Sequence, residues 1–196
     1  GRDRLEGVTM ARVDEKRNPI PGTEQYVECD TLLLSVVLLP ENELSRALGV
    51  EMDPVTGGPR VAENRQTSIP GVYACGHVLH VHDIVDFVSK ESTIAGKSAA
   101  AYNLQSQSGA EQVTLKAAGA VRYTVPQMAS LEEPFSIFCR VAYPVSSGKF
   151  LVKAGDQVIL EKKFIKAVPS EMEEIPVRKA ELEKIANVCR WVPANA

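Results

Sequence analysis

The sequence predicts an α/β region followed by a small antiparallel β-sandwich, and three observations support this fold class. Residues 32–39 form a continuous apolar run, which is typical of a strand covered on both faces, as in a parallel sheet. Residues 84–102 carry apolar side chains at helical spacing, as an amphipathic helix does. Residues 121–160 alternate apolar and polar side chains in several short runs, which is the pattern of a sandwich.

The change from one pattern to the other falls across a polar stretch, "QSQSGAEQ", that has no apolar period. We therefore divide the chain into residues 1–105, a linker at 106–114, and a β-sandwich-like domain at 115–196. The last domain is expected to make few contacts with the first hundred residues. It is a candidate for covering a domain or subunit surface, and so for an oligomer contact, rather than for performing chemistry.

Composition excludes some partners. The 196 residues are 44% hydrophobic and 24% charged, with a formal net charge of −3, which is ordinary for a soluble globular protein. This charge and the lack of basic residues interleaved with aromatic ones argue against nucleic acid as a partner. The longest apolar run, 32–40, is less than half of what a bilayer requires, and no leader precedes it. No membrane is expected as a partner, and the expected location is the cytoplasm.

The first fifty residues are expected to contain three strands and a short helix. Residues 5–15 and 18–30 read as two short antiparallel strands joined by a Pro- and Gly-containing turn. The apolar run 32–39 then forms a strand that ends at Pro40. A short helix follows, and Gly49 supplies its stop signal.

The next segment reads as strand, turn and helix. A turn at Pro70 and Gly71 precedes a short strand, 72–75, that ends at Gly76. A helix then begins somewhere between Asp83 and Ser89. Gly76 allows close approach to the backbone, and the start of the helix offers free N–H groups and a positive dipole to an anion or a carbonyl.

In the C-terminal domain, alternation from Phe135 to Val141 assigns Ile137 and Cys139 to an apolar face. Arg140 falls on the other face and is expected to be solvated. "KAGDQV" predicts a hairpin turn, and a short helix near 179–187 is expected to close the domain.

Three histidines and an acidic residue lie close together in the sequence: His77, His80, His82 and Asp83. They could supply metal ligands, but no second cluster completes a site, so no metal is expected. Hydrogen-bonded histidines lining a loop are the preferred interpretation, with acid/base chemistry as the alternative. Asp83 or Asp86 is expected to cap the helix.

The four cysteines, Cys29, Cys75, Cys139 and Cys189, include no C-x-x-C pair. Neither a zinc ribbon nor a dithiol redox motif is therefore expected from their spacing. Each lies beside β-prone residues, where a free cysteine packs as a small hydrophobic side chain.

The stretch "TSIPGVYACGHV", residues 67–78, resembles the second flavin fingerprint of the pyridine nucleotide-disulphide oxidoreductases, T-x-x-P-G-[VI]-[FY]-A-x-G-D-V. The matching positions are Thr67, Pro70, Gly71, Val72, Tyr73, Ala74, Gly76 and Val78. "CDTLLLSVVLLPEN" is similar to the strand that returns to the flavin domain in this family, with Val37 where glycine is usual. The resemblance is strong up to about Gln105.

This resemblance implies a partial two-dinucleotide-fold flavoprotein: the end of an NAD(P)-binding domain and the last strand and helix of an FAD domain. It places Gly76 and His77 beside the ribityl chain of FAD. His77 stands where the family has Asp, or Asn in the branch of FAD-dependent oxidoreductases that the stretch "GHVLHVHDIVDFVSKE" resembles. A neutral imidazole accepts or donates one hydrogen bond but brings no fixed negative charge. The resemblance also places Val88 and Ser89, with Lys90, at the pyrimidine edge of the flavin. No catalytic residue is assigned.

The sequence contains no G-x-G-x-x-G turn, although the family uses one for FAD and one for NAD(P). The chain is therefore expected to be the C-terminal part of a longer flavoprotein and inactive alone. The intact enzyme would move a hydride between NAD(P)H, or a small amine or alcohol substrate, and FAD. The alternative is a free-standing, non-catalytic binding or interaction module.

Overall fold

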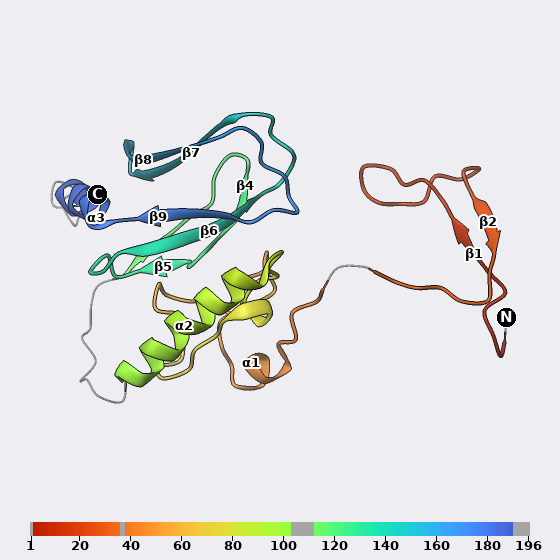
Figure 1. The fold of residues 1–196 in the computed structure, drawn as a ribbon, viewed down its shortest axis with the longest axis horizontal. Helices are drawn as coiled ribbons and strands as arrows, with labels where there is room; N and C mark the ends of the chain where they lie inside the picture. Colours follow the sequence, from red (N-terminus) through yellow and green to blue (C-terminus); the bar gives the residue numbers. More distant parts are fainter. Residues whose placement is uncertain (1, 36–37, 103–111, 190–196) are drawn as a thin grey trace. The chain divides into compact units, whose positions relative to one another are not determined.

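The computed structural model describes residues 2–35, 38–102 and 112–189 (Figure 1). It divides into two compact units, Gly1–Val37 and Leu38–Ala196. Every strand pair formed within the described ranges is antiparallel, so this is a mixed α/β structure with small antiparallel sheets. None of the helices in these ranges is long and apolar enough to span a bilayer.

The first unit contains a two-stranded ribbon. Strand β1 (Gly7–Met10) pairs with β2 (Gln25–Glu28), and Val8 lies opposite Val27. Antiparallel pairing between two strands needs only a short connection, which the turn residues between them provide. The N-terminal ribbon that the sequence predicts is confirmed.

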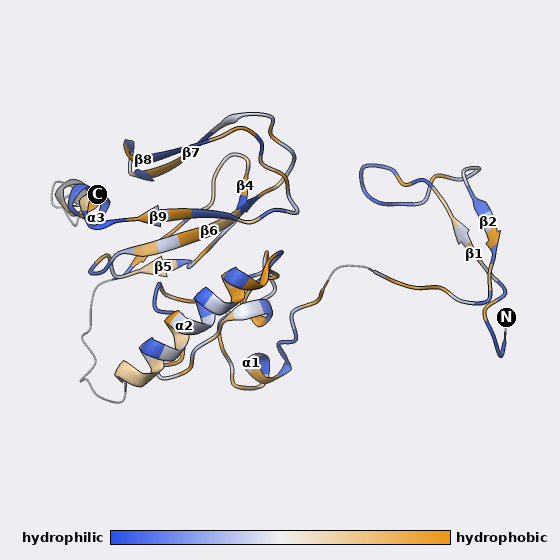
Figure 2. Cartoon of the chain, in the orientation of Figure 1, coloured by the Kyte–Doolittle hydropathy of each residue, from blue (hydrophilic) through white to orange (hydrophobic). Residues whose placement is uncertain are grey.

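The strand predicted at 32–39 is wrong where the structure describes this run. Residues 32–35 and 38–39 are not in strand conformation, and the side chains of Leu33 and Leu34 are 90% and 72% exposed. Figure 2 shows the hydrophobic character of the described residues on either side of the grey trace at 36–37. A strand persists only beside a neighbour that satisfies its backbone groups, and no other segment in the described ranges occupies that position.

In the second unit, the two helices predicted from periodicity are confirmed. Helix α1 (Glu43–Ala47) ends just before Gly49, which has a φ of +77° that favours glycine. Helix α2 (Val85–Tyr102) begins inside the predicted window of 83–89. The apolar stripe of α2 therefore has the spacing that the sequence indicated.

The short strand predicted at 72–75 is wrong, because a single isolated bridge between Tyr73 and Gln66 replaces it. The chain then turns at Gly76, whose φ is +75°, into the 3₁₀ turn η1 (Gly76–Val78). This change of direction ends the pairing before a ladder can extend.

The described residues after 112 form seven strands in three sheets and one helix. The antiparallel pairing predicted for this region is confirmed. The small sheets are β3 (Val113–Thr114) with β5 (Met128–Ala129), then β4 (Val121–Val125), β6 (Phe135–Val141) and β9 (Glu173–Val177), then β7 (Gly148–Ala154) with β8 (Gln157–Phe164), followed by helix α3 (Lys179–Cys189). The three-stranded sheet and the β7–β8 hairpin share one hydrophobic core.

Strand β6 has two buried faces. Ile137, Cys139 and Val141 belong to the core shared with β7 and β8. The alternate residues Phe138 and Arg140 face the other way, toward the side of the sheet where α2 lies (Figure 1). The sheet is therefore a middle layer, with the hairpin on one face and α2 on the other.

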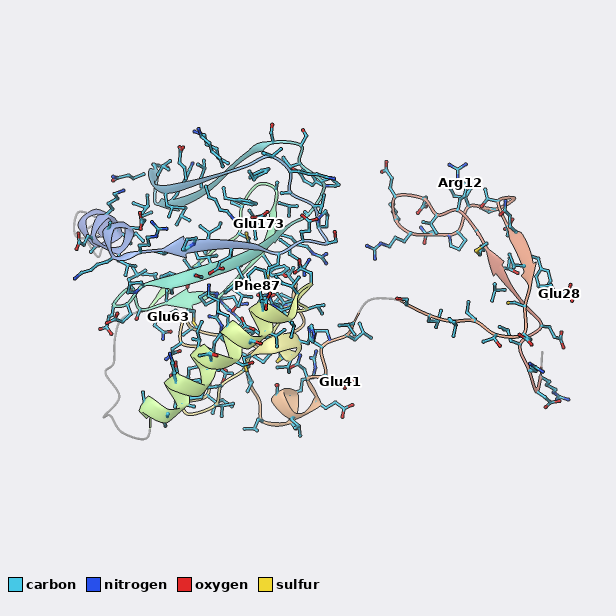
Figure 3. All side chains as sticks on the ribbon, viewed as in Figure 1. Arg12, Glu28, Glu41, Glu63, Phe87 and Glu173 are labelled. Carbon is cyan, nitrogen blue, oxygen red and sulfur yellow. The ribbon has the colours of Figure 1, made fainter. Side chains whose placement is uncertain are left out.

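The prediction that the β-rich region makes few contacts with the first hundred residues is wrong. Phe87 of α2 packs edge-on against Phe138, with ring centroids 5.5 Å apart, and it points from the helix toward the sheet in Figure 3. The side chain of Gln127 accepts a hydrogen bond of 3.0 Å from the amide of Val61. The alternating pattern of β6 showed which residues share a face, but not that a helix covers the second face.

Candidate functional site

The segment that carries the fingerprint folds into a tight turn ending at Gly76. Its start is fixed by a 2.8 Å backbone hydrogen bond from Thr67 N–H to the carbonyl of Val72. Gly76 is buried, and a Cβ placed on it would lie 3.5 Å from Cγ1 of Val88 in α2. The turn therefore lies directly against the start of the helix.

Behind this turn lies a buried carboxylate, Glu91, whose side chain is completely inaccessible to solvent. Its Oε1 accepts a 3.0 Å hydrogen bond from Nε of Arg65 and lies 3.2 Å from Nε2 of His80. Its Oε2 accepts a 2.8 Å bond from the amide of Gly76 and lies 3.0 Å from Nε2 of His82. We refer to these five residues as the Glu91 cluster.

The charges in the Glu91 cluster balance. Burial by itself raises the pKa of the Glu91 carboxyl, but hydrogen bonds from His80 and His82 and the charge of Arg65 outweigh it and hold that pKa far below its usual range. Burial lowers the pKa of His80, and the hydrogen bond with Glu91 only partly opposes this. Ionised Glu91 and protonated Arg65 therefore form the charge pair, with His80 a neutral donor at neutral pH.

This arrangement assigns the histidine tautomers. Because Glu91 is ionised, it accepts hydrogen bonds, so the Nε2 atoms of His80 and His82 carry protons. The Nδ1 atom of neutral His80 is then an acceptor, and the Nδ1 atoms of both histidines are buried without a hydrogen-bond partner. The two rings meet edge to face, with centroids 4.4 Å apart. The cluster thus confirms the prediction that His80 and His82 are hydrogen-bonded histidines of a loop.

A metal ion is the other chemistry that these residues could support. His80, His82 and Glu91 each offer a ligand atom, and these atoms all lie within 4.8 Å of one another. However, Arg65 donates to the same carboxylate, and its positive charge opposes a second cation there. The donor set therefore suits proton-mediated hydrogen bonds better than it suits a metal.

The residues that the resemblance assigned to the flavin lie in two neighbouring pairs. Gly76 is buried against Val88, while His77 and Ser89, the next residue in each segment, are exposed. Because α2 begins at Val85, the amides that the helix leaves without internal partners are those of residues 85–87. The free amides lie up to one turn before Val88 and Ser89, whose own N–H groups point into the helix.

One ring nitrogen of His77 already takes part in a hydrogen bond within the chain. Its Nδ1 accepts a 3.2 Å hydrogen bond from the backbone amide of His82. Neutral His77 therefore carries its proton on Nε2, at the exposed side of the ring. At the position where the resemblance implies Asp or Asn, this chain presents an Nε2–H donor.

Two residues of the cluster were not anticipated from the sequence, Arg65 and Glu91. Glu91 carried a signal, because it occupies an apolar-stripe position of α2, between Val88 and Ile94 in helical spacing. A carboxylate at such a position is buried and needs partners. Arg65 carried no signal, since it lies in an irregular loop and its φ of +70° is a property of the folded backbone.

Asp83, one of the two residues expected to cap α2, uses both carboxylate oxygens elsewhere. Oδ1 accepts a 3.2 Å hydrogen bond from Arg140, and Oδ2 accepts one of 3.3 Å from the amide of Met172. These bonds join the loop before α2 to β6 and to the segment before β9. Asp83 thus connects the loop before α2 to the β-sheet region through hydrogen bonds.

The cysteines whose side chains the structure describes, Cys29, Cys75 and Cys139, are free thiols. Burial raises the pKa of the Cys139 thiol to about 12. The thiolate is the reactive form, so this side chain is inert at neutral pH.

Comparison with protein families identifies one match. A model described as pyridine nucleotide-disulphide oxidoreductase matches residues 5–108, which is more than half of the 196 residues. The match includes the ribbon, the fingerprint turn and α2. Comparison with curated proteins found no match. Comparison with solved structures found none either.

Proposed function

Because the chain belongs to the pyridine nucleotide-disulphide oxidoreductase family, we propose that it forms part of an FAD-dependent enzyme and carries the edge of its flavin site. The intact enzyme moves a hydride between FAD and NAD(P)H, or between FAD and a small amine or alcohol substrate. Bound FAD would supply the hydride acceptor and donor. This chain supplies the residues that hold the ribityl and pyrimidine portions.

One observation carries the proposal: the positive-φ turn at Gly76 lies against the first turns of α2, with His77 exposed beside it. The Gly76 amide is already donated to Glu91, so this bond holds the turn in place without a ligand. A preformed turn of this kind lowers the entropy cost of binding.

The exposed groups around this turn fit a flavin. His77 offers an Nε2–H donor, which suits a ribityl hydroxyl or a phosphate oxygen as acceptor. The amides of residues 85–87 and the positive end of the α2 dipole suit the carbonyl oxygen of a pyrimidine ring. The Nε2–H group of His77 and the amides of residues 85–87 favour a ligand edge rich in acceptors.

The rest of the cofactor needs groups beyond this edge. The sequence has no Gly-rich phosphate turn, so the pyrophosphate and adenosine of FAD, and all of NAD(P), need another segment. The exposed leucines Leu33, Leu34 and Leu39 present apolar surface that a neighbouring segment would cover. We propose that this segment belongs to the remainder of the flavoprotein.

A titration with riboflavin tests the site, because riboflavin has the isoalloxazine and the ribityl chain but no adenosine. We expect riboflavin to shift the NMR signals of the His77 ring and of the amides 85–87, and adenosine, which carries neither a ribityl chain nor a phosphate, to leave them unchanged. His77→Ala should weaken the riboflavin shifts, whereas His77→Asn, which keeps a donor, should retain them. Lys149→Gln, on the exposed face of β7, is the matched control.

The alternative, a non-catalytic interaction module, predicts a different result. Riboflavin would then leave residues 76–89 unperturbed. The reading frame upstream of the Gly1 codon gives a second, independent distinction. Two G-x-G-x-x-G turns there support the flavoprotein, and their absence supports the module.

A further inference from the structure

Arg140 lies on β6, beyond the family-matched residues, yet it reaches the loop before α2. Its side chain is only 12% exposed. Its guanidinium donates to the hydroxyl of Tyr123 at 3.2 Å and to the carbonyl of Pro169 at 3.1 Å. It also donates to the carbonyl of Val81 at 2.9 Å and to Oδ1 of Asp83 at 3.2 Å.

The two acceptors on the loop are well placed to fix it. Val81 and Asp83 flank His82, and all three lie between η1 and the first residue of α2, Val85. Asp83 is held from a second direction by the amide of Met172. The β-sheet region therefore clamps this loop through one cation and one backbone amide.

The clamped loop controls the two parts of the proposed flavin edge. The backbone amide of His82, between the two clamped residues, donates to Nδ1 of His77 and so sets which ring nitrogen of His77 is protonated. Asp83 is two residues before Val85, so its position sets where the first turn of α2 begins. A shift in the loop would move both groups together.

A second set of contacts holds the β-sheet against α2 and the loop that precedes it. Lys90 of α2 forms an ion pair with Glu174 of β9, which also accepts a 2.6 Å bond from Ser136. His80 packs edge-on against Tyr123 and Phe138, with centroids 5.9 and 6.3 Å away. The clamp therefore acts from a surface that is itself fixed to α2.

We propose that Arg140 is a positioning residue of the flavin site: from β6 it holds Val81 and Asp83, and through them the His77 tautomer and the first turn of α2. This rests on the proposed function. Arginine is required because four acceptors in different directions match its five donors, whereas lysine offers three at one point. The β-rich region is thus part of the flavin site, and not only a cover for it.

The test compares Arg140→Gln and Arg140→Lys with Lys149→Gln, which removes an exposed ion pair on β7. We expect hydrogen exchange of two hydrogen-bonded amides, His82, which donates to His77, and Met172, which donates to Asp83, to accelerate about tenfold in both Arg140 variants, as loss of interactions to a charged group implies. Exchange in β7 and β8 should not change. The ¹⁵N signals of the His77 ring should move from the Nε2–H pattern to a mixture of tautomers, and the riboflavin shifts should weaken.

The outcomes separate this inference from the proposed function. Unchanged exchange of the His82 and Met172 amides and an unchanged His77 tautomer in both Arg140 variants would overturn the positioning role, even if riboflavin still binds. If the His77 tautomer changes in the Arg140 variants but the unsubstituted chain does not bind riboflavin, Arg140 positions the loop and the proposed flavin site is wrong. If the Arg140 variants do not fold, Asp83→Asn decides by the same two readouts, because it leaves Arg140 in place.

Discussion

The backbone amide of Gly76 donates a 2.8 Å hydrogen bond to the buried carboxylate of Glu91. The bond joins the fingerprint turn to the second turn of α2, 15 residues away in the sequence. The bond explains why these two residues occur together. Glu91 holds the Gly76 turn at a φ of +75°, and the Gly76 amide gives the buried carboxylate a hydrogen-bond partner.

Glu91→Gln should destabilise the second unit strongly. The substitution removes the charge that compensates buried Arg65 and leaves one oxygen to accept four donors. Removing one partner of a buried ion pair costs about 3 kcal/mol or more. Urea unfolding measures this loss, and Glu161→Gln in the exposed pair with Lys149 should change stability by less than about 1 kcal/mol. Equal effects of the two substitutions would contradict the role of the cluster.

Gly76→Ala and Gly96→Ala should have opposite signs. At Gly76 the added Cβ makes an ordinary contact, but the φ of +75° is strained for alanine, so we expect a loss of about 1–2 kcal/mol. At Gly96, in the middle of α2, the Cβ meets nothing within 4 Å, so alanine should stabilise by about 0.5–1 kcal/mol. Thermal unfolding of both variants gives the comparison, and a neutral Gly76→Ala would show that the turn is not fixed.

Stability should fall on acidification in two stages. The groups around His80 are Glu91, His82, Arg65 and Tyr123. His80 has a folded-state pKa below its ordinary 6.5, so the unfolded chain binds more protons below that pH and stability is lost as the pH falls further. Glu91, with a pKa depressed from 4.5, adds a second loss below that value. The measurement is the free energy of unfolding between pH 3 and 8.

His80→Asn is the control for the pH profile, because asparagine can donate to Glu91 but does not titrate. The first stage, which begins near pH 6.5, should shrink in this variant, while the stage due to Glu91 should remain. A wild-type profile that is flat from pH 7 to 5 would argue against a buried neutral His80.

The purified chain should not hold a metal at His80, His82 and Glu91. Arg65 contributes its positive charge to the carboxylate that a cation would need. Elemental analysis after dialysis against a chelator should find less than a stoichiometric amount of zinc or iron. A stoichiometric metal that is lost on His80→Ala would show that the hydrogen-bonded assignment is mistaken.

The sequence allowed prediction of what depends on local pattern. Helical spacing located α2, and period-two alternation separated Ile137 and Cys139 from Arg140. Arg140 was nevertheless expected to be solvated, because alternation does not reveal that a second layer covers the other face. The Glu91 cluster combines a loop arginine, a turn amide and two histidines, and only the folded chain brings them together. The run 32–39 shows the converse, since its pattern is that of a strand but its pairing needs a neighbour.

If the chain supplies only the ribityl and pyrimidine edge, it should be colourless when purified and should not oxidise NADH or NADPH. A few hydrogen bonds at about 1 kcal/mol each do not offset the cost of immobilising a large ligand. The full-length flavoprotein should be yellow. Gel filtration after mixing the chain with excess FAD should therefore leave no stoichiometric flavin at the protein peak.

The most direct measurement is the ratio of the dissociation constants of FAD and riboflavin for this 196-residue chain, obtained by NMR titration of the His77 ring and amides 85–87. The adenosine half of FAD has no Gly-rich turn to bind, so the two constants should be similar, and both weak. FAD binding about a hundredfold tighter than riboflavin, which corresponds to roughly 2.7 kcal/mol, would show that the chain anchors the whole cofactor. Absence of any riboflavin binding would equally contradict the account, because the edge at Gly76 and His77 would then not be a flavin site.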